Sequence, residues 1–77
     1  MNQNDILQTI TKNICEVMGE TMAITPEMSL RELGANSIDR ADILMQTMSD
    51  LKLKLSMIEF ASAKNIGDIA AIFQRAL

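Results

Sequence analysis

The chain opens with its strongest periodic pattern. Four apolar residues recur at spacings of 4, 4 and 3 along one stripe: Ile6, Ile10, Ile14 and Val17. This is the repeat of one face of an α-helix, so we predict a helix over residues 4–18. Asn4 is the expected N-cap, with Asp5 in the positively polarised first turn. Gly19 is expected to end the helix, because glycine enters the left-handed region without a Cβ penalty.

Every other segment with a clear period is also helical. We predict a second helix from Asn36 or Ser37 to residue 51, a short one over 57–62 and a last one over 66–77. The later two helices each begin with a pair of residues three apart, the spacing of a capping box: Ser56 with Glu59, and Asn65 with Asp68. The predicted fold is all-α, a four-helix bundle with three longer helices and a short third one, in a single domain over 1–77.

Residues 20–36 form the one long connection, and they hold the only proline. Apolar residues punctuate it at short intervals: Met22, Ile24, Met28, Leu30 and Leu33. We therefore expect a loop that is anchored on the core. Ser29 and Glu32 have capping-box spacing, which favours one helical turn near 29–33. Residues 52–55 alternate like a strand, but a lone four-residue strand has no partner, so we expect a loop with buried leucines.

The second helix has an apolar surface that is too wide for one core face. At about 100° per residue, one stripe is assigned to the core: Ile43, Leu44, Thr47 and Leu51. An adjacent stripe is left outside the core: Ile38, Ala41, Met45 and Met48. Carboxylates hold the remaining arc: Asp39, Asp42 and Asp50. Arg40 falls among the core positions and is expected to lean outward in the first turn.

Composition excludes several classes of function. The 77 residues include 7 Lys and Arg against 10 Asp and Glu, a formal net charge of −3, which disfavours nucleic acid as a partner. The absence of histidine excludes His-based catalytic triads and His metal sites. The single cysteine, Cys15, cannot form an intramolecular disulfide, which is typical of a cytoplasmic protein. No apolar run approaches the roughly 20 residues that span a bilayer, and we expect no membrane contact.

Few residues could carry chemistry. Asp39 and Asp42 have the spacing of an acid–base pair, although a solvated polar face explains them more simply. Cys15 has no histidine to activate it and is expected to be partly buried. Ser37 follows a glycine at the amino end of a helix, where serine caps the helix or enters its first turn. The same position favours a phosphate esterified to the hydroxyl. A hydrolase built on Ser37 is poorly supported, since no His or nearby Lys could deprotonate it.

The segment Gly34-Ala35-Asn36-Ser37-Ile38 resembles the G-x-D-S-[LI] signature of acyl carrier proteins. The resemblance extends along the whole chain, including the long loop, the acidic second helix and the short third helix. It implies that Ser37 carries 4′-phosphopantetheine, transferred from coenzyme A by a separate phosphopantetheinyl transferase, and that acyl groups are held as thioesters on its terminal sulfur. Asn36 stands where the family usually has Asp, so one negative charge is missing and the set of partners is expected to be narrower.

Two runs look like the free-standing donor carrier proteins of polyketide β-branching cassettes: residues 34–41 and 58–68. In those pathways the donor brings an acetyl group to a synthase related to hydroxymethylglutaryl-CoA (HMG-CoA) synthase. The resemblance implies a non-enzymatic monomer. Its expected partners are the transferase, an HMG-CoA-synthase-like enzyme, a ketosynthase or decarboxylase, and an acyltransferase. A chain that starts at Met1 and stops just after its last helix suits a stand-alone protein. The alternatives are a generic fatty-acid or polyketide carrier, a peptidyl carrier, or, from another class, a cofactor-free helical interaction module.

The predicted partner face is an apolar ridge that starts beside Ser37 and is flanked by carboxylates. Its residues are Asn36, Ile38, Asp39, Ala41, Asp42, Met45 and Met48, with a second contact at Glu59 and Phe60. A partner groove edged by Arg or Lys would fit this face, with charge setting the encounter rate and the ridge setting the residence time. Glu often occupies the position of Met48 in the family, so Met48 is expected to shift recognition toward apolar contact.

Overall fold

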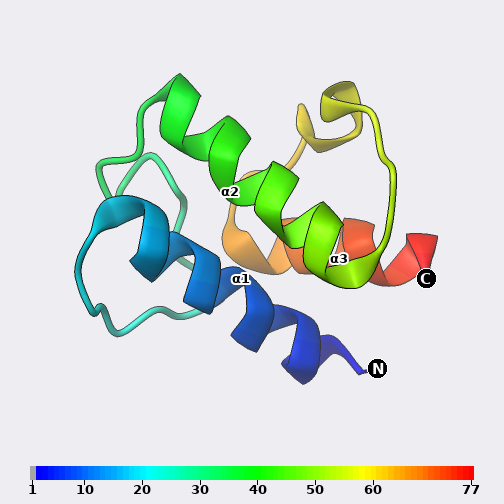
Figure 1. The fold of residues 1–77 in the computed structure, drawn as a ribbon, viewed down its shortest axis with the longest axis horizontal. Coiled ribbons are helices and arrows are strands. Elements are labelled where there is room, and N and C mark those ends of the chain that lie inside the picture. Colours follow the sequence, from blue (N-terminus) through cyan, green and yellow to red (C-terminus); the bar gives the residue numbers. More distant parts are fainter. Residues whose placement is uncertain (1) are drawn as a thin grey trace.

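The computed structural model describes residues 2–77. Its elements follow in the order α1 (Gln3–Met18), α2 (Ser37–Leu51), the short 3₁₀-helix η1 (Met57–Phe60) and α3 (Ile66–Ala76). The long loop between α1 and α2 lies at one end of the molecule, and the two termini lie toward the opposite end (Figure 1). The predicted all-α bundle with three longer helices is confirmed, and the short third element is a single 3₁₀ turn.

Helix α1 begins earlier than predicted. Asn2 is the N-cap: its side chain accepts a hydrogen bond from the Asp5 N–H at 2.9 Å, and Asp5 accepts one from the Asn2 N–H at 3.2 Å. The prediction of Asn4 was wrong because the reciprocal box needs an acidic or amide side chain three residues after the cap, and Asp5 stands in that relation to Asn2. Gly19 ends the helix with φ 76°, as predicted.

The core is built from the predicted stripes of the three α-helices. Its buried side chains include Ile6, Ile10 and Ile14 from α1, Ile43, Leu44 and Leu51 from α2, and Ile66, Ile69, Ile72 and Phe73 from α3. The last helix was predicted to extend to Leu77, but α3 ends at Ala76, and Leu77 is 53% exposed. Phe60 of η1 packs on Phe73 with ring centroids 5.0 Å apart, which fastens η1 to the core.

The long loop is anchored as expected, and it also closes the amino end of α3. Leu30 is buried, and the other predicted anchors are half-buried against the core. Ser29 and Glu32 exchange two hydrogen bonds of 3.1 Å across a turn, as their spacing predicted. The N–H groups of Ile66 and Gly67 donate to the carbonyls of Met28 at 2.8 Å and Pro26 at 2.9 Å. These bonds tie the loop to the start of α3.

The segment between α2 and α3 departs from prediction at one cap. Ser56 precedes η1 but makes no side-chain capping bond, so its expected box with Glu59 is absent. Asn65 does cap α3, since its side chain accepts a hydrogen bond from the Asp68 N–H at 2.8 Å. Residues 52–55 are a loop, and Leu53 and Leu55 are half-buried in it, as expected.

A buried polar network, which the sequence did not reveal, joins α1 to α2. Asn13 is 1% exposed, and its amide nitrogen donates to the Thr47 hydroxyl at 2.9 Å and to the Asp50 carboxylate at 3.1 Å. Lys12 forms an ion pair with Asp50 at 3.2 Å. The hydrogen bond from Asn13 to Asp50 holds the pKa of that carboxyl below its ordinary value, and Lys12 adds to the effect. The network fixes the register of α2, and therefore the place of Ser37, against α1.

Two classes of site are absent from residues 2–77. No helix in this range is long and apolar enough to cross a bilayer. Within the same range, no group of three or more acidic or cysteine side chains is arranged to hold a metal ion.

Candidate functional site

Ser37 is the first residue of α2, and its side chain is exposed. Asn36 immediately before it is the N-cap: its amide oxygen accepts from the Asp39 N–H at 2.8 Å, and Asp39 accepts from the Asn36 N–H at 3.3 Å. Gly34 turns the chain into the helix with φ 90°, and buried Ala35 fixes the turn on the core. Ser37 therefore stands on a rigid base, as a first-turn residue, with its hydroxyl facing solvent.

Two backbone donors lie open beside the Ser37 hydroxyl. The N–H groups of Asp39 and Arg40 are both taken by Asn36, through its side chain and its carbonyl. The N–H groups of Ser37 and Ile38 precede the first intrahelical bond, and they have no acceptor within residues 2–77. Open N–H groups at the positive end of a helix favour an anion. The residues present thus fit a phosphate ester on Ser37.

Comparison with known proteins assigns the family. The chain matches the model of the phosphopantetheine attachment site over residues 8–73, which includes Ser37 and its turn. It is also 42% identical to the polyketide biosynthesis acyl-carrier-protein AcpK of Bacillus subtilis (strain 168), over 94% of this chain and 90% of that one. The chain belongs to the acyl carrier proteins. Members of this family carry acyl groups and are not themselves catalysts.

A solved structure gives the same assignment from the fold. This carrier protein is similar to a chain in the crystal structure of the Curacin biosynthetic pathway HMG synthase in complex with acetyl donor-ACP. The two share 40% identity with a TM-score of 0.87, over 95% of this chain and 96% of that one. This match confirms the expected carrier fold, and the match to the attachment-site family confirms the 4′-phosphopantetheine cofactor, which the alternative of a cofactor-free interaction module lacks.

The predicted ridge on α2 is exposed only in part. Ile38 and Met45 are 70% and 59% exposed, and Ala41 is half-buried beside them. Met48 is only 9% exposed, which corrects its placement on the ridge. Met48 belongs to the hydrophobic core, and Leu53 in the loop after α2 packs against the same core.

The second predicted contact, on η1, also needs correction. Phe60 is 7% exposed because it packs on Phe73, so it belongs to the core. Glu59 is exposed as expected. The exposed apolar residues of η1 are Met57, at 40%, and Ile58, at 77%, and sequence reasoning missed both. The sequence could have predicted the exposure of Ile58: on a short helical turn, residues two apart point in different directions, so Ile58 cannot face the core together with Phe60.

The carboxylates beside the ridge differ in their surroundings. Asp42 is exposed, whereas Asp39 is half-buried and occupied by the capping box with Asn36. Asp50 belongs to the network between α1 and α2. Asp42 and Glu59 are thus the predicted acidic contacts with the most exposed carboxylates.

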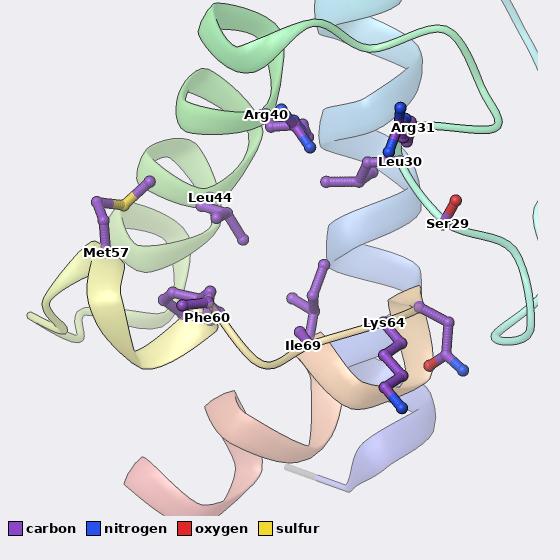
Figure 2. Close-up of a pocket in the computed structure, with 12 residues that line it drawn as sticks. Ser29, Leu30, Arg31, Arg40, Leu44, Met57, Phe60, Lys64 and Ile69 are labelled. Atoms are coloured by element: carbon purple, nitrogen blue, oxygen red, sulfur yellow. The ribbon is translucent and has the colours of Figure 1, made fainter.

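A cleft of about 390 Å³ opens next to this face, between the long loop, α2, η1 and the start of α3. Figure 2 shows Leu30, Leu44 and Ile69 pointing into it from three different elements. Arg40 lines its edge, and its side chain is exposed, so Arg40 leans out of the core as predicted.

Proposed function

We propose that Ser37 is the residue that receives 4′-phosphopantetheine. The observation that carries the proposal is an exposed serine hydroxyl with two open backbone N–H groups beside it, inside the segment that matches the attachment-site family. The hydroxyl is accessible to a transferase, and the open N–H groups with the helix dipole favour the phosphodiester that forms.

The protein needs no catalytic group of its own for this role. When bound, the group supplies a thiol on a flexible arm, and acyl groups are carried there as thioesters. The chain contributes a fixed point of attachment, because Asn36 caps α2 and the Asn13 network holds α2 against α1. The chain also contributes a surface that partner enzymes recognise. The tether raises the local concentration of the cargo at the partner's active site.

The attachment is tested by intact-protein mass spectrometry after incubation with coenzyme A and a broad-range transferase. We expect the wild-type chain to gain one phosphopantetheine and Ser37→Ala to gain none. Ser49→Ala is the matched control, since it removes another exposed serine hydroxyl from the same helix, and it should be modified like wild type. A mass gain on Ser37→Ala would refute the assignment.

We further propose that this carrier works in polyketide biosynthesis as the acetyl donor to an HMG-CoA-synthase-like enzyme. Two similarities support this: 42% identity to a polyketide carrier, and 40% identity to a chain in a complex of an HMG synthase with its acetyl donor-ACP. The match covers 96% of that second chain, so the matched chain of the complex has the length of a carrier protein. The transferase, a ketosynthase or decarboxylase, and an acyltransferase are its other proposed partners, in the cytoplasm.

The donor role is tested by acetyl transfer. The acetyl-loaded protein is mixed with the HMG synthase of the Curacin pathway, and the synthase is examined for an acetyl adduct by mass spectrometry. Loaded AcpK serves as a second carrier for comparison. We expect transfer from this protein to the synthase. Transfer from AcpK without transfer from this protein would favour the generic polyketide, fatty-acid or peptidyl carrier.

We propose that the partner docks on the exposed apolar residues of α2 and η1, with acidic side chains around them. The apolar part is Ile38, Ala41, Met45, Met57 and Ile58, and the polar part is Asn36, Asp39, Asp42 and Glu59. Such a surface suits a partner groove with a cationic edge and a short-lived contact. Met48 and Phe60 lie in the core beneath this surface.

Docking is tested with Met45→Glu, which places a charge in the apolar part. We expect transfer to fall by about fivefold or more, the effect of losing more than 1 kcal/mol at an interface. Leu77→Glu is the control, because Leu77 is similarly exposed but lies at the end of the chain, beyond α3. Equal transfer by the two variants would refute the docking surface.

A further inference from the structure

The cleft beside α2 has an apolar floor and a cationic rim. Leu30, Leu44 and Ile69 form its floor, and Arg31, Arg40 and Lys64 are the charged residues that line it. Figure 2 shows Arg31 and Arg40 near one end and Lys64 near the other. No Asp or Glu lines the cleft.

Within residues 2–77, none of the three cations of this rim forms an ion pair. The ion pair found within residues 2–77 joins Lys12 to Asp50, away from the cleft. Glu32, next to Arg31 in the sequence, instead accepts a hydrogen bond from the Ser29 N–H. Three of the chain's seven basic residues thus surround one hollow in a protein whose net charge is −3. Their charge is complementary to an anion.

The cleft begins close to Ser37. Arg40 follows Ser37 by three residues on α2, about 4.5 Å along the helix axis at 1.5 Å per residue. An arm attached at Ser37 therefore leaves the helix next to the rim. The volume of about 390 Å³ is within the range of small-molecule sites, about 300–1,000 Å³.

We propose that this cleft receives the end of the protein's own arm when the arm carries an acyl group with a terminal carboxylate. The carbon chain lies on the apolar floor, and the carboxylate meets the cationic rim. The inference depends on the proposed attachment at Ser37. Each rim cation is exposed and contributes little alone, so the preference arises because the tether keeps the carboxylate near several of them. A neutral acyl group of the same size makes only the apolar contacts with the floor of the cleft.

The test compares two cargoes that differ by one functional group. The protein is loaded with a succinyl group and, separately, with its terminal amide, succinamyl, both joined to the arm through an amide in place of the thioester so that neither hydrolyses. Backbone amide chemical shifts of the cleft-lining residues Ala61, Ala63 and Ile69 are measured against the unacylated holo-protein. We expect shifts about threefold larger for the carboxylate cargo, and we expect high salt to reduce the difference.

Charge variants connect the preference to the rim. Arg31→Gln with Lys64→Gln should abolish the difference between the two cargoes. Arg40 is left intact because it lies about one turn from Ser37, the proposed attachment point of the arm that both cargoes share. The control is Lys52→Gln with Lys54→Gln, which makes the same change in net charge on exposed residues outside the cleft, and it should retain the difference.

The outcomes separate this inference from the proposed function. Absence of any mass gain on loading would overturn the attachment at Ser37. Normal loading with equal shifts for the two cargoes, or a difference that persists in the Arg31 and Lys64 double variant, would overturn the cleft alone.

Discussion

Met48 and Met45 make a matched pair, because the two methionines lie on the same helix three residues apart, one at 9% exposure and the other at 59%. Replacing each with Glu asks whether position 48 belongs to the partner surface or to the core. Full burial of a methionine side chain is worth about 1.5–3 kcal/mol. A carboxylate in its place must also lose its hydration or become neutral, which costs a few kcal/mol more.

We therefore expect Met48→Glu to lose at least about 3 kcal/mol of unfolding free energy. A 77-residue domain has roughly 4–12 kcal/mol in total, at about 0.05–0.15 kcal/mol per residue. For a domain of this size 1 kcal/mol corresponds to about 4–8 °C in Tm, so the Tm should fall by roughly 12–24 °C. Met45→Glu changes an exposed position and should stay within about 0.5 kcal/mol of wild type, or about 4 °C.

Thermal unfolding followed by far-UV circular dichroism measures both variants in the same buffer. The measurement is repeated at acidic pH, where protonation of the introduced carboxyl should recover part of the loss in Met48→Glu only. A Tm for Met48→Glu within about 4 °C of Met45→Glu would refute the burial argument and return Met48 to the partner surface.

Three further predictions concern the contacts that hold Ser37 in place. Thr47→Val leaves a buried Asn13 N–H without its acceptor and should lower the free energy of unfolding by about 1–3 kcal/mol. Thr47→Val combined with Asn13→Leu should lose less than the sum of the two single changes. Additive losses in urea unfolding would contradict the network. Asp50 has a lowered pKa when folded, so its contribution is present above the ordinary value of 3.8 and is lost as pH falls below it. Asp50→Asn should therefore be less stable than wild type, by under about 1 kcal/mol, at neutral pH, and the gap should narrow as the pH falls below 3.8. A constant gap would argue against the Lys12 and Asn13 contacts. Gly34→Ala should cost about 1–2 kcal/mol through its φ of 90° alone, because the added Cβ would meet only the end of one side chain at 4.0 Å; an unchanged Tm would contradict this.

Patterns that repeat over many residues predicted the fold well. In the first predicted stripe Ile6, Ile10 and Ile14 are fully buried and Val17 is half-buried, and the core stripe of α2 was assigned correctly. Each prediction depends on the average over a whole helix face, so one misjudged residue does not alter it. Boundaries depend on single hydrogen bonds, and the start of α1 was therefore misplaced from Asn2 to Asn4.

The position of Ser37 at the start of α2 was predicted correctly, and the exposure of the residues around it was predicted less well. Ser37 lies where its signature placed it, because a glycine turn and a capping residue are local signals. Met48 and Phe60 were misplaced because their exposure depends on tertiary packing: Met48 lies within the hydrophobic core, and Phe60 packs on Phe73 of α3. A periodicity on one helix cannot say how many neighbours cover it. The cationic cleft was missed for the same reason, since its lining comes from four separate segments.

The arrangement separates stiffness from flexibility in a way that suits a carrier. The Asn13–Thr47 hydrogen bond joins two buried side chains of α1 and α2, where an apolar pair would also pack but would tolerate sliding of one helix on the other. Buried polar pairs specify register, and here register determines where the Ser37 hydroxyl and the exposed Ile38 and Met45 stand relative to the rest of the surface. If α2 were free to shift, ordering it would reduce the binding free energy of every partner. With α2 fixed, the motion needed for delivery is left to the attached arm, and the same surface can be presented repeatedly in short-lived contacts.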